Sequence, residues 1–182
     1  MRRILTAALT AALLTASPAL AADRAPAGGS SLSGWAILGW GSAVGIGASF
    51  QTPLVPQGLI HDPGFKVRDS LDLDLGVDYL SYWNHYYSGP DYYDVSVFNL
   101  HAGLIWNFWI TPQIAIYPKA ALGFGIAQYS YSPNWKLDGR HGSYGGLYPE
   151  LAVGGQLMLG NSVSVRGELG WAGLKLGVGF AF

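Results

Sequence analysis

Hydrophobic and polar residues alternate with a period of two along most of this chain. In the stretch DSLDLDLGVDYLSY, one face carries Leu71, Leu73 and Leu75. The opposite face carries Asp72 and Asp74. Successive side chains of a β-strand point to opposite faces, whereas a helix would repeat about every 3.6 residues. The pattern therefore predicts β-strands with one apolar face each.

Short segments rich in glycine, proline and asparagine separate the alternating stretches. A tight turn at Gly41-Ser42 divides the first stretch, and ITPQ at 110–113 and LGNS at 159–162 mark further hairpins. Eight strands are then predicted, at 34–40, 43–51, 68–82, 94–109, 113–130, 143–158, 162–170 and 174–182. Without the turn at Gly41 the count would be seven. Pro118 and Pro149 fall inside strand patterns and predict bulges there.

The two faces of these strands differ in residue size as well as in polarity. The apolar face carries large residues such as Trp106, Phe108 and Phe124, and the other face mixes charged residues with glycine. Glycine has no packing role on a water-facing strand but fits a narrow interior. An apolar exterior around a small, polar interior predicts an all-β, eight-stranded antiparallel up-and-down transmembrane β-barrel. Closure would pair the last strand with the first, so the alternation can continue to Phe182.

The N-terminus has a different composition from the rest of the chain. Arg2 and Arg3 precede an apolar run and the triplet Ala-Leu-Ala at 19–21, which is the pattern of a secretory signal peptide. We expect a signal peptide over 1–21, a flexible leader over 22–33 and the barrel over 34–182. The apolar run is too short for a helix that spans about 30 Å of hydrocarbon.

Composition excludes several classes of function. The chain has no cysteine, so it offers no disulfide or thiolate site. Its net charge of −1 gives no basic surface for nucleic acid. The four histidines have no spacing typical of metal ligands. We therefore expect no metal, no cofactor and no nucleic-acid partner.

The C-terminal half resembles the small outer-membrane β-barrels of Gram-negative bacteria, the OmpA-like eight-stranded group. The resemblance is carried by PKAALGFG, by ELAVGGQLMLGNSVSVRGELGW as a strand–turn–strand unit, and by the terminal LKLGVGFAF. It implies a monomer in the cell outer membrane, in contact with membrane lipid and lipopolysaccharide. It also implies that Phe182 is the C-terminal aromatic residue read by the barrel-assembly machinery. The group indicates a fold and a location more than an activity.

Charged residues on the inward face form the first candidate site. Unpaired charge in a dry interior is costly, so these residues should form one hydrogen-bonded network. The set comprises Asp72, Asp74, Asp78, His101, Lys119, Glu150, Arg166, Glu168 and Lys175. We expect the network to close the lumen as a structural plug, with a narrow porin-like ion path as the alternative.

Aromatic residues gather in the stretch YLSYWNHYYSGPDYYD. They are Tyr79, Tyr82, Trp83, Tyr86, Tyr87, Tyr92 and Tyr93. Amphipathic rings favour the headgroup zone of a membrane, so an aromatic girdle with an ordered loop is expected. The alternative is a surface that binds a sugar or another protein.

Two other functional classes remain open from the sequence. His141, Ser143 and Glu150 resemble the His-x-Ser pair and Glu of the outer-membrane lipid A deacylases, although Tyr144 stands where that family has Asn. A nucleophile needs its base within hydrogen-bond reach, and Ser143 and Glu150 differ in face parity. The other class is a secreted lipocalin-like barrel, which needs an apolar lumen and a polar exterior. The expected role is structural or surface-binding, without catalysis.

Overall fold

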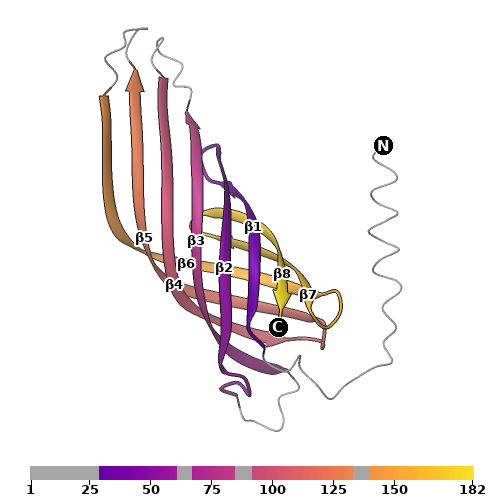
Figure 1. Cartoon of the computed structure of the whole chain (residues 1–182). Coiled ribbons are helices and arrows are strands. Elements are labelled where there is room, and N and C mark those ends of the chain that lie inside the picture. The colour runs from indigo at the N-terminus through magenta and orange to yellow at the C-terminus, as the bar shows by residue number, and fades with distance from the viewer. Residues whose placement is uncertain (1–28, 61–66, 85–91, 133–139) are drawn as a thin grey trace, which may run out of the picture.

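The computed structural model describes residues 29–60, 67–84, 92–132 and 140–182 of the 182-residue chain. Eight antiparallel strands form a closed barrel in sequence order, with β8 beside β1 (Figure 1). The strands are β1 (Ser31–Gly39), β2 (Ala43–Val55), β3 (Arg68–Asn84), β4 (Tyr92–Trp109), β5 (Ile114–Ser132), β6 (Arg140–Met158), β7 (Val163–Gly170) and β8 (Gly173–Ala181). The predicted fold class is confirmed. The described part of the chain has no helix long and apolar enough to cross a membrane.

The turn between β1 and β2 lies at Gly41 and Ser42, as predicted from the sequence. Gly39 pairs with Ala43, and Trp40, Gly41 and Ser42 connect them. Gly41 and Ser42 have positive φ angles of 71° and 69°, a region that glycine adopts without strain. The division of the first stretch into β1 and β2 is therefore confirmed.

Most strands run longer than the alternation predicted. β1 begins at Ser31, inside the segment assigned to the leader, because Ser31 pairs with Ala181 across the seam. Ser33 faces the lumen and is buried, so a polar residue occupies an inward position that the hydrophobic pattern did not reveal. The backbone N–H of Phe182 donates to Ser30 O at 2.9 Å and extends the seam by one more contact.

The predicted bulges at Pro118 and Pro149 are wrong. Pairing between β5 and β6 runs without a register shift from Ile114 to Tyr131 and includes both prolines. Beside Pro118, which has no N–H, the β4–β5 pairs are interrupted and then resume in the same register. The barrel's register shift lies instead in β2, between Pro53 and Val55.

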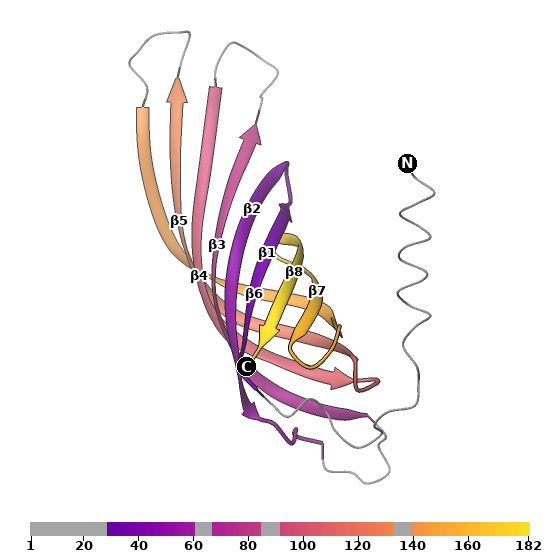
Figure 2. The same cartoon turned by 45° about the vertical axis from the view of Figure 1, so that its right-hand side comes forward.

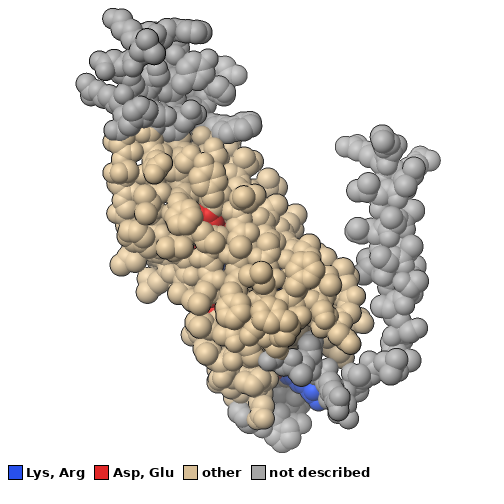
Figure 3. Space-filling model, viewed as in Figure 1, with Lys and Arg blue, Asp and Glu red and all other residues tan. Residues whose placement is uncertain are grey.

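The two faces of the barrel wall have the predicted polarity. Large apolar side chains cover the outside, as at Leu122, which is 63% exposed, and we call this surface the apolar belt. The face seen in Figure 3 is nearly free of charged side chains. Charged residues such as Asp74 and Lys119 point into the lumen and are buried. This polarity is the reverse of that expected for a lipocalin-like barrel.

Inward glycines make room for tyrosines on the neighbouring strand. Gly123 pairs with Tyr148, and a Cβ atom at Gly123 would overlap the Tyr148 ring. Gly154 stands in the same relation to Tyr117. At these two inward positions the space of the missing side chain is therefore filled by a tyrosine ring from the neighbouring strand.

The wall of the barrel is uneven in height. β3, β4, β5 and β6 have 17, 18, 19 and 19 residues, whereas β7, β8 and β1 have 8, 9 and 9. Both ends of the described barrel chain, near Ser31 and Ala181, lie at one end, which we call the terminal end. The four long strands extend beyond the others at the opposite, far end (Figures 1 and 2).

Candidate functional site

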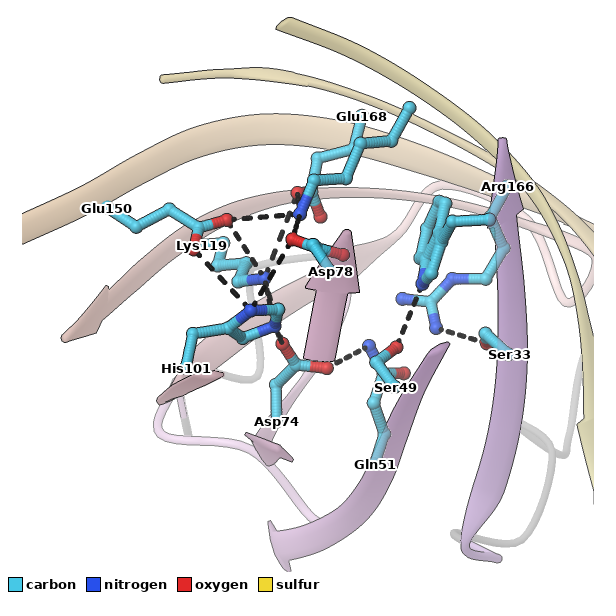
Figure 4. A network of polar contacts seen from close by, with 12 residues as sticks. Ser33, Ser49, Gln51, Asp74, Asp78, His101, Lys119, Glu150, Arg166 and Glu168 are labelled. Atoms are coloured by element: carbon cyan, nitrogen blue, oxygen red, sulfur yellow. Dashed lines mark hydrogen bonds and ion pairs between the residues drawn. The ribbon is translucent and has the colours of Figure 1, made fainter. Parts of the chain in front are cut away.

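Seven charged or ionisable side chains meet in the middle of the lumen and form what we call the central ion cluster (Figure 4). The members are Asp74 and Asp78 on β3, His101 on β4, Lys119 on β5, Glu150 on β6, Glu168 on β7 and Lys175 on β8. All seven are buried. Six of the eight strands therefore contribute a side chain to one group of contacts.

The ammonium group of Lys119 contacts three carboxylates. Its Nζ lies 2.9 Å from Asp74 Oδ2 and 3.4 Å from Glu150 Oε1. Glu168 Oε1 lies further away, at 3.8 Å. Because buried charges must be paired to offset their desolvation, this ammonium group holds β3, β6 and β7 to β5.

Lys175, on β8, also contacts several carboxylates in the lumen. Its Nζ donates to Asp78 Oδ2 at 2.7 Å and to Glu150 Oε1 at 3.4 Å. Glu150 thus lies between both lysines. The two ammonium groups share Glu150 and Glu168, so removal of Lys175 leaves Asp78 without an ammonium partner and leaves the two glutamates with Lys119 alone.

His101 fills the centre of the cluster. Its Nε2 lies 3.1 Å from Lys119 Nζ and 3.2 Å from Asp74 Oδ2. Its Nδ1 lies 3.7 Å from both Asp78 Oδ2 and Glu150 Oε2. Within the cluster the four carboxylates face two ammonium groups, and the His101 ring lies between them.

Arg166 lies apart from the central ion cluster, although the sequence placed it in the same network. Its guanidinium is stacked between the rings of Trp35 and Tyr117, 5.3 and 5.4 Å from their centroids. Nη1 donates to Ser33 Oγ at 3.1 Å (Figure 4). Among the described residues, Nε and Nη2 have no hydrogen-bond partner. The expectation of one continuous network is therefore wrong at Arg166.

Asp72 also lies outside the cluster. Asn107 Nδ2 donates to Asp72 Oδ2 at 2.8 Å and lies 3.3 Å from Ser70 Oγ. The described ion pairs do not include Asp72. The inward face thus divides into the central ion cluster and a second zone, in which Asp72 and Arg166 have neutral hydrogen-bond partners and interact with each other at longer range.

Several lumen residues were not singled out from the sequence. Gln51 Nε2 donates to Asp74 Oδ1 at 3.2 Å, and Trp35 Nε1 donates to Ser49 Oγ at 3.0 Å. Ser49 and Gln51 are uncharged, so they were not included in the predicted charge network, and Trp35 was not assigned to a face. Extending the alternation of β8 across the seam to β1 would have placed Trp35 inside.

The aromatic residues of the predicted girdle do not share one surface. Tyr79 points outward, is 46% exposed and donates its hydroxyl to Ser96 Oγ at 3.0 Å. Tyr82 points inward and packs against Trp35, Ile37 and Leu80, so its place in an outward girdle is wrong. Trp83 is the next-to-last residue of β3, and Tyr92 and Tyr93 begin β4. Tyr86 and Tyr87 lie outside the described residues.

Ser143 and Glu150 do not form a catalytic pair. Ser143 pairs with Gln128 and is exposed, whereas Glu150 is buried in the central ion cluster. They stand on opposite faces of β6, and seven residues of strand span roughly 23 Å. The backbone of His141 lies in β6. The deacylase-like alternative is therefore contradicted in its serine and glutamate positions.

Metal chemistry finds no support in the described residues. They contain no group of three or more His, Asp or Glu arranged to hold a metal ion. What the central ion cluster can do is fill the lumen and join the strands around it. Its members are buried inside a barrel of eight strands, a size whose interior is in general just wide enough for side chains.

Comparison with known proteins identifies the fold. No protein-family model matches the sequence, and no curated protein matches it significantly. A structure described as "De novo design of transmembrane beta-barrels" has a TM-score of 0.54 and 15% identity over 85% of this chain and 96% of that one. Ail, the attachment invasion locus protein of Yersinia pestis, has a TM-score of 0.53 and 14% identity over 85% of this chain and 99% of Ail. Ail in complex with the heparin analogue sucrose octasulfate gives 0.52 and 13%. This chain therefore has the fold of the eight-stranded transmembrane β-barrels.

Proposed function

We propose that this chain is an exported, monomeric outer-membrane β-barrel with a structural or surface-binding role and no catalytic activity. The observation that carries the proposal is the combination of a continuous apolar belt with a lumen filled by the central ion cluster. The belt suits hydrocarbon, and the filled lumen suits a protein that stabilises or presents a surface.

The fold and the N-terminal pattern together support the proposed location. Residues 1–21 have the composition of a signal peptide, and export is required for a barrel that enters the outer membrane. The partners proposed for the apolar belt are outer-membrane lipid and lipopolysaccharide. The terminal end would face the periplasm and the long strands β3–β6 would extend toward the exterior.

Phe182 is proposed as the residue recognised by the barrel-assembly machinery. Its side chain is 77% exposed at the end of the seam strand, while its backbone is held by Ser30. An aromatic side chain in that position is accessible to a partner before the barrel is complete. Substitution Phe182→Ala should lower the amount of folded protein in the outer membrane without changing the lumen.

The proposal is tested by fractionation and by conductance of the full-length protein. Expressed in a Gram-negative host, the protein should enter the outer-membrane fraction and migrate differently in SDS gels before and after boiling. Reconstituted in planar bilayers, the native protein should give no steady ion conductance. Recovery as a soluble periplasmic protein would contradict the location, and a steady conductance would contradict the sealed lumen.

A further inference from the structure

A carboxylate stands on the outward face of β3, beside residues of the apolar belt. Asp69 has the same parity as Leu75, which points outward and is 43% exposed. Its partner across the β3–β4 ladder is Phe108, and Phe108 pairs in turn with Ile116, which is 51% exposed. A charge on the lipid-facing side of a membrane barrel is destabilising. Asp69 is nevertheless only 4% exposed, so other parts of the chain cover it.

The residues that follow β2 contact this carboxylate. Gly58 N donates to the last carbonyl of β2 at 3.0 Å, so the chain turns there. Leu59 N and Ile60 N then donate to the two Asp69 carboxylate oxygens, at 2.7 and 3.2 Å. Gly58 has a φ angle of 77°, and a Cβ atom there would overlap the Asp69 side chain. We call residues 56–60 the strap, because they pack closely over the outward side of Asp69.

An indole on the neighbouring strand completes the contacts of Asp69. Trp106 on β4 donates its Nε1–H to Asp69 Oδ2 at 2.7 Å, and its ring lies against Phe108 with the centroids 4.7 Å apart. The carboxylate thus accepts from the side of the wall as well as from the strap. The backbone N–H groups of Leu59 and Ile60 are satisfied within the protein, which irregular backbone requires where water is scarce.

The strap presents an apolar surface in place of the carboxylate. Leu59 directs its backbone N–H at Asp69, while its residue surface remains 52% exposed. Leu54, near the end of β2, is 51% exposed. Residues 53–60 contain no charged side chain. The apolar belt therefore continues from β3 and β4 onto the strap.

We infer that the strap lies within the periplasmic leaflet of the membrane, with the Leu59 side chain against phospholipid acyl chains at the headgroup boundary. Continuity with the apolar belt identifies this occupant, because the strap rests on the outward side of the strands that form the belt. Asp69 acts as a positioning residue that holds the strap in place. The inference rests on the proposed membrane location and adds a connecting segment to the surface that contacts lipid.

Spin labels at single cysteines test the depth of the strap. The chain has no cysteine, so each substitution gives one labelled position. Leu59→Cys, the belt variant Leu122→Cys and Gln113→Cys, in the exposed turn between β4 and β5, are each reconstituted as the full chain in vesicles of phosphatidylethanolamine and phosphatidylglycerol. Power-saturation EPR then compares the accessibility of each label to oxygen, which concentrates in hydrocarbon, with its accessibility to a water-soluble nickel chelate.

The oxygen-to-nickel ratio should place the strap between the belt and the turn. The ratio at Leu59→Cys should be at least about threefold higher than at Gln113→Cys, because an interfacial segment buries its apolar side at the headgroup and acyl boundary. The ratio at Leu122→Cys should be the highest of the three, since Leu122 belongs to the belt.

Substitution Asp69→Ala tests how the strap is held. Combined with Leu59→Cys, it removes the acceptors of both strap N–H groups, so the ratio should fall at least twofold toward that of the turn label. Combined with Leu122→Cys, it should leave the ratio unchanged if the barrel is still inserted. Ser70→Ala is the matched control at the next position, because the hydrogen bond described there comes from β4, and it should leave the ratio at Leu59→Cys unchanged.

Three results would count against these statements in different ways. A Leu59→Cys label as accessible to nickel as the turn label, with Leu122→Cys in lipid, would overturn the inference and leave the membrane location standing. Loss of the oxygen preference at Leu122→Cys would contradict the membrane location itself, and the inference with it. A Leu59→Cys label that keeps its depth in folded Asp69→Ala would show that Asp69 does not position the strap.

Discussion

The ammonium group of Lys175 on β8 and the carboxylate of Asp78 on β3 lie 2.7 Å apart across the lumen. β1 and β2 separate these two strands in the wall, so the contact joins parts of the barrel that no backbone ladder joins. Lys175 is also on the seam strand that pairs with β1. β8 is therefore held in two ways, because its backbone pairs with β1 and the Lys175 side chain contacts Asp78 on β3.

Substitution Lys175→Met should destabilise the barrel by about 3–5 kcal/mol, because it leaves Asp78 and Glu150 buried without this cation. The measurement is the free energy of unfolding from urea titration in detergent micelles. The double variant Lys175→Met/Asp78→Leu should regain part of the loss, since it removes the uncompensated acid together with its partner. A change below about 0.5 kcal/mol in the single variant would contradict the pairing, because surface substitutions fall in that range.

Gly123 should tolerate no side chain while Tyr148 is present. A Cβ atom at Gly123 overlaps the Tyr148 ring, so Gly123→Ala should cost about 1–3 kcal/mol of folding free energy. Gly146→Ala is the matched control on the neighbouring strand, because its Cβ atom meets open space. Urea titration should separate the two variants, and Gly123→Ala combined with Tyr148→Ala should lose less than the two single changes together. Equal stability of both alanine variants would be evidence against the glycine–tyrosine packing.

The sequence was sufficient for the fold because the period of two assigns every strand residue to a face. Lys119, Glu150 and Lys175 were placed inside on that ground alone, and the structure has them there. The period does not give the height of a residue in the barrel, because height depends on the register between strands. For this reason the pattern could not separate Arg166 from the central ion cluster.

The other differences have separate causes. Tyr82 was grouped with its aromatic neighbours by composition, although its parity is that of Asp74 and Asp78 on the inward face of β3. Ser31 pairs across the seam, and a polar residue at a strand end gives no hydrophobic signal. Pairing with a distant strand, rather than local sequence, determines where β1 begins.

Asp69 should hold the segment after β2 against the outside of the wall at the terminal end. Its carboxylate accepts from Leu59 N at 2.7 Å, Ile60 N at 3.2 Å and Trp106 Nε1 at 2.7 Å. Asp69→Ala removes both acceptor oxygens and with them all three hydrogen bonds, and hydrogen bonds to a charged group contribute about 1.5–3 kcal/mol each. Amide exchange at Leu59 and Ile60 should then accelerate at least tenfold in hydrogen–deuterium measurements.

Ser70→Ala is the control for this segment, because the hydrogen bond described at Ser70 comes from Asn107 at 3.3 Å and involves neither Leu59 nor Ile60. It should leave exchange at Leu59 and Ile60 unchanged. Unchanged exchange in Asp69→Ala would mean that the segment is held by other contacts.

Arg166 should respond to substitution in the opposite way from Lys175. Its guanidinium is buried between the rings of Trp35 and Tyr117, and among the described residues no carboxylate lies within ion-pair distance of it, although Asp72 interacts with it at longer range. Replacing a poorly compensated buried charge by an apolar side chain of similar length is often neutral or stabilising. Arg166→Met should therefore change the free energy of unfolding by less than about 1 kcal/mol, set against the 3–5 kcal/mol expected for Lys175→Met. A loss as large as that of Lys175→Met would mean that the guanidinium has a counter-charge beyond the contacts described, and the lumen would then have to be treated as one electrostatic unit.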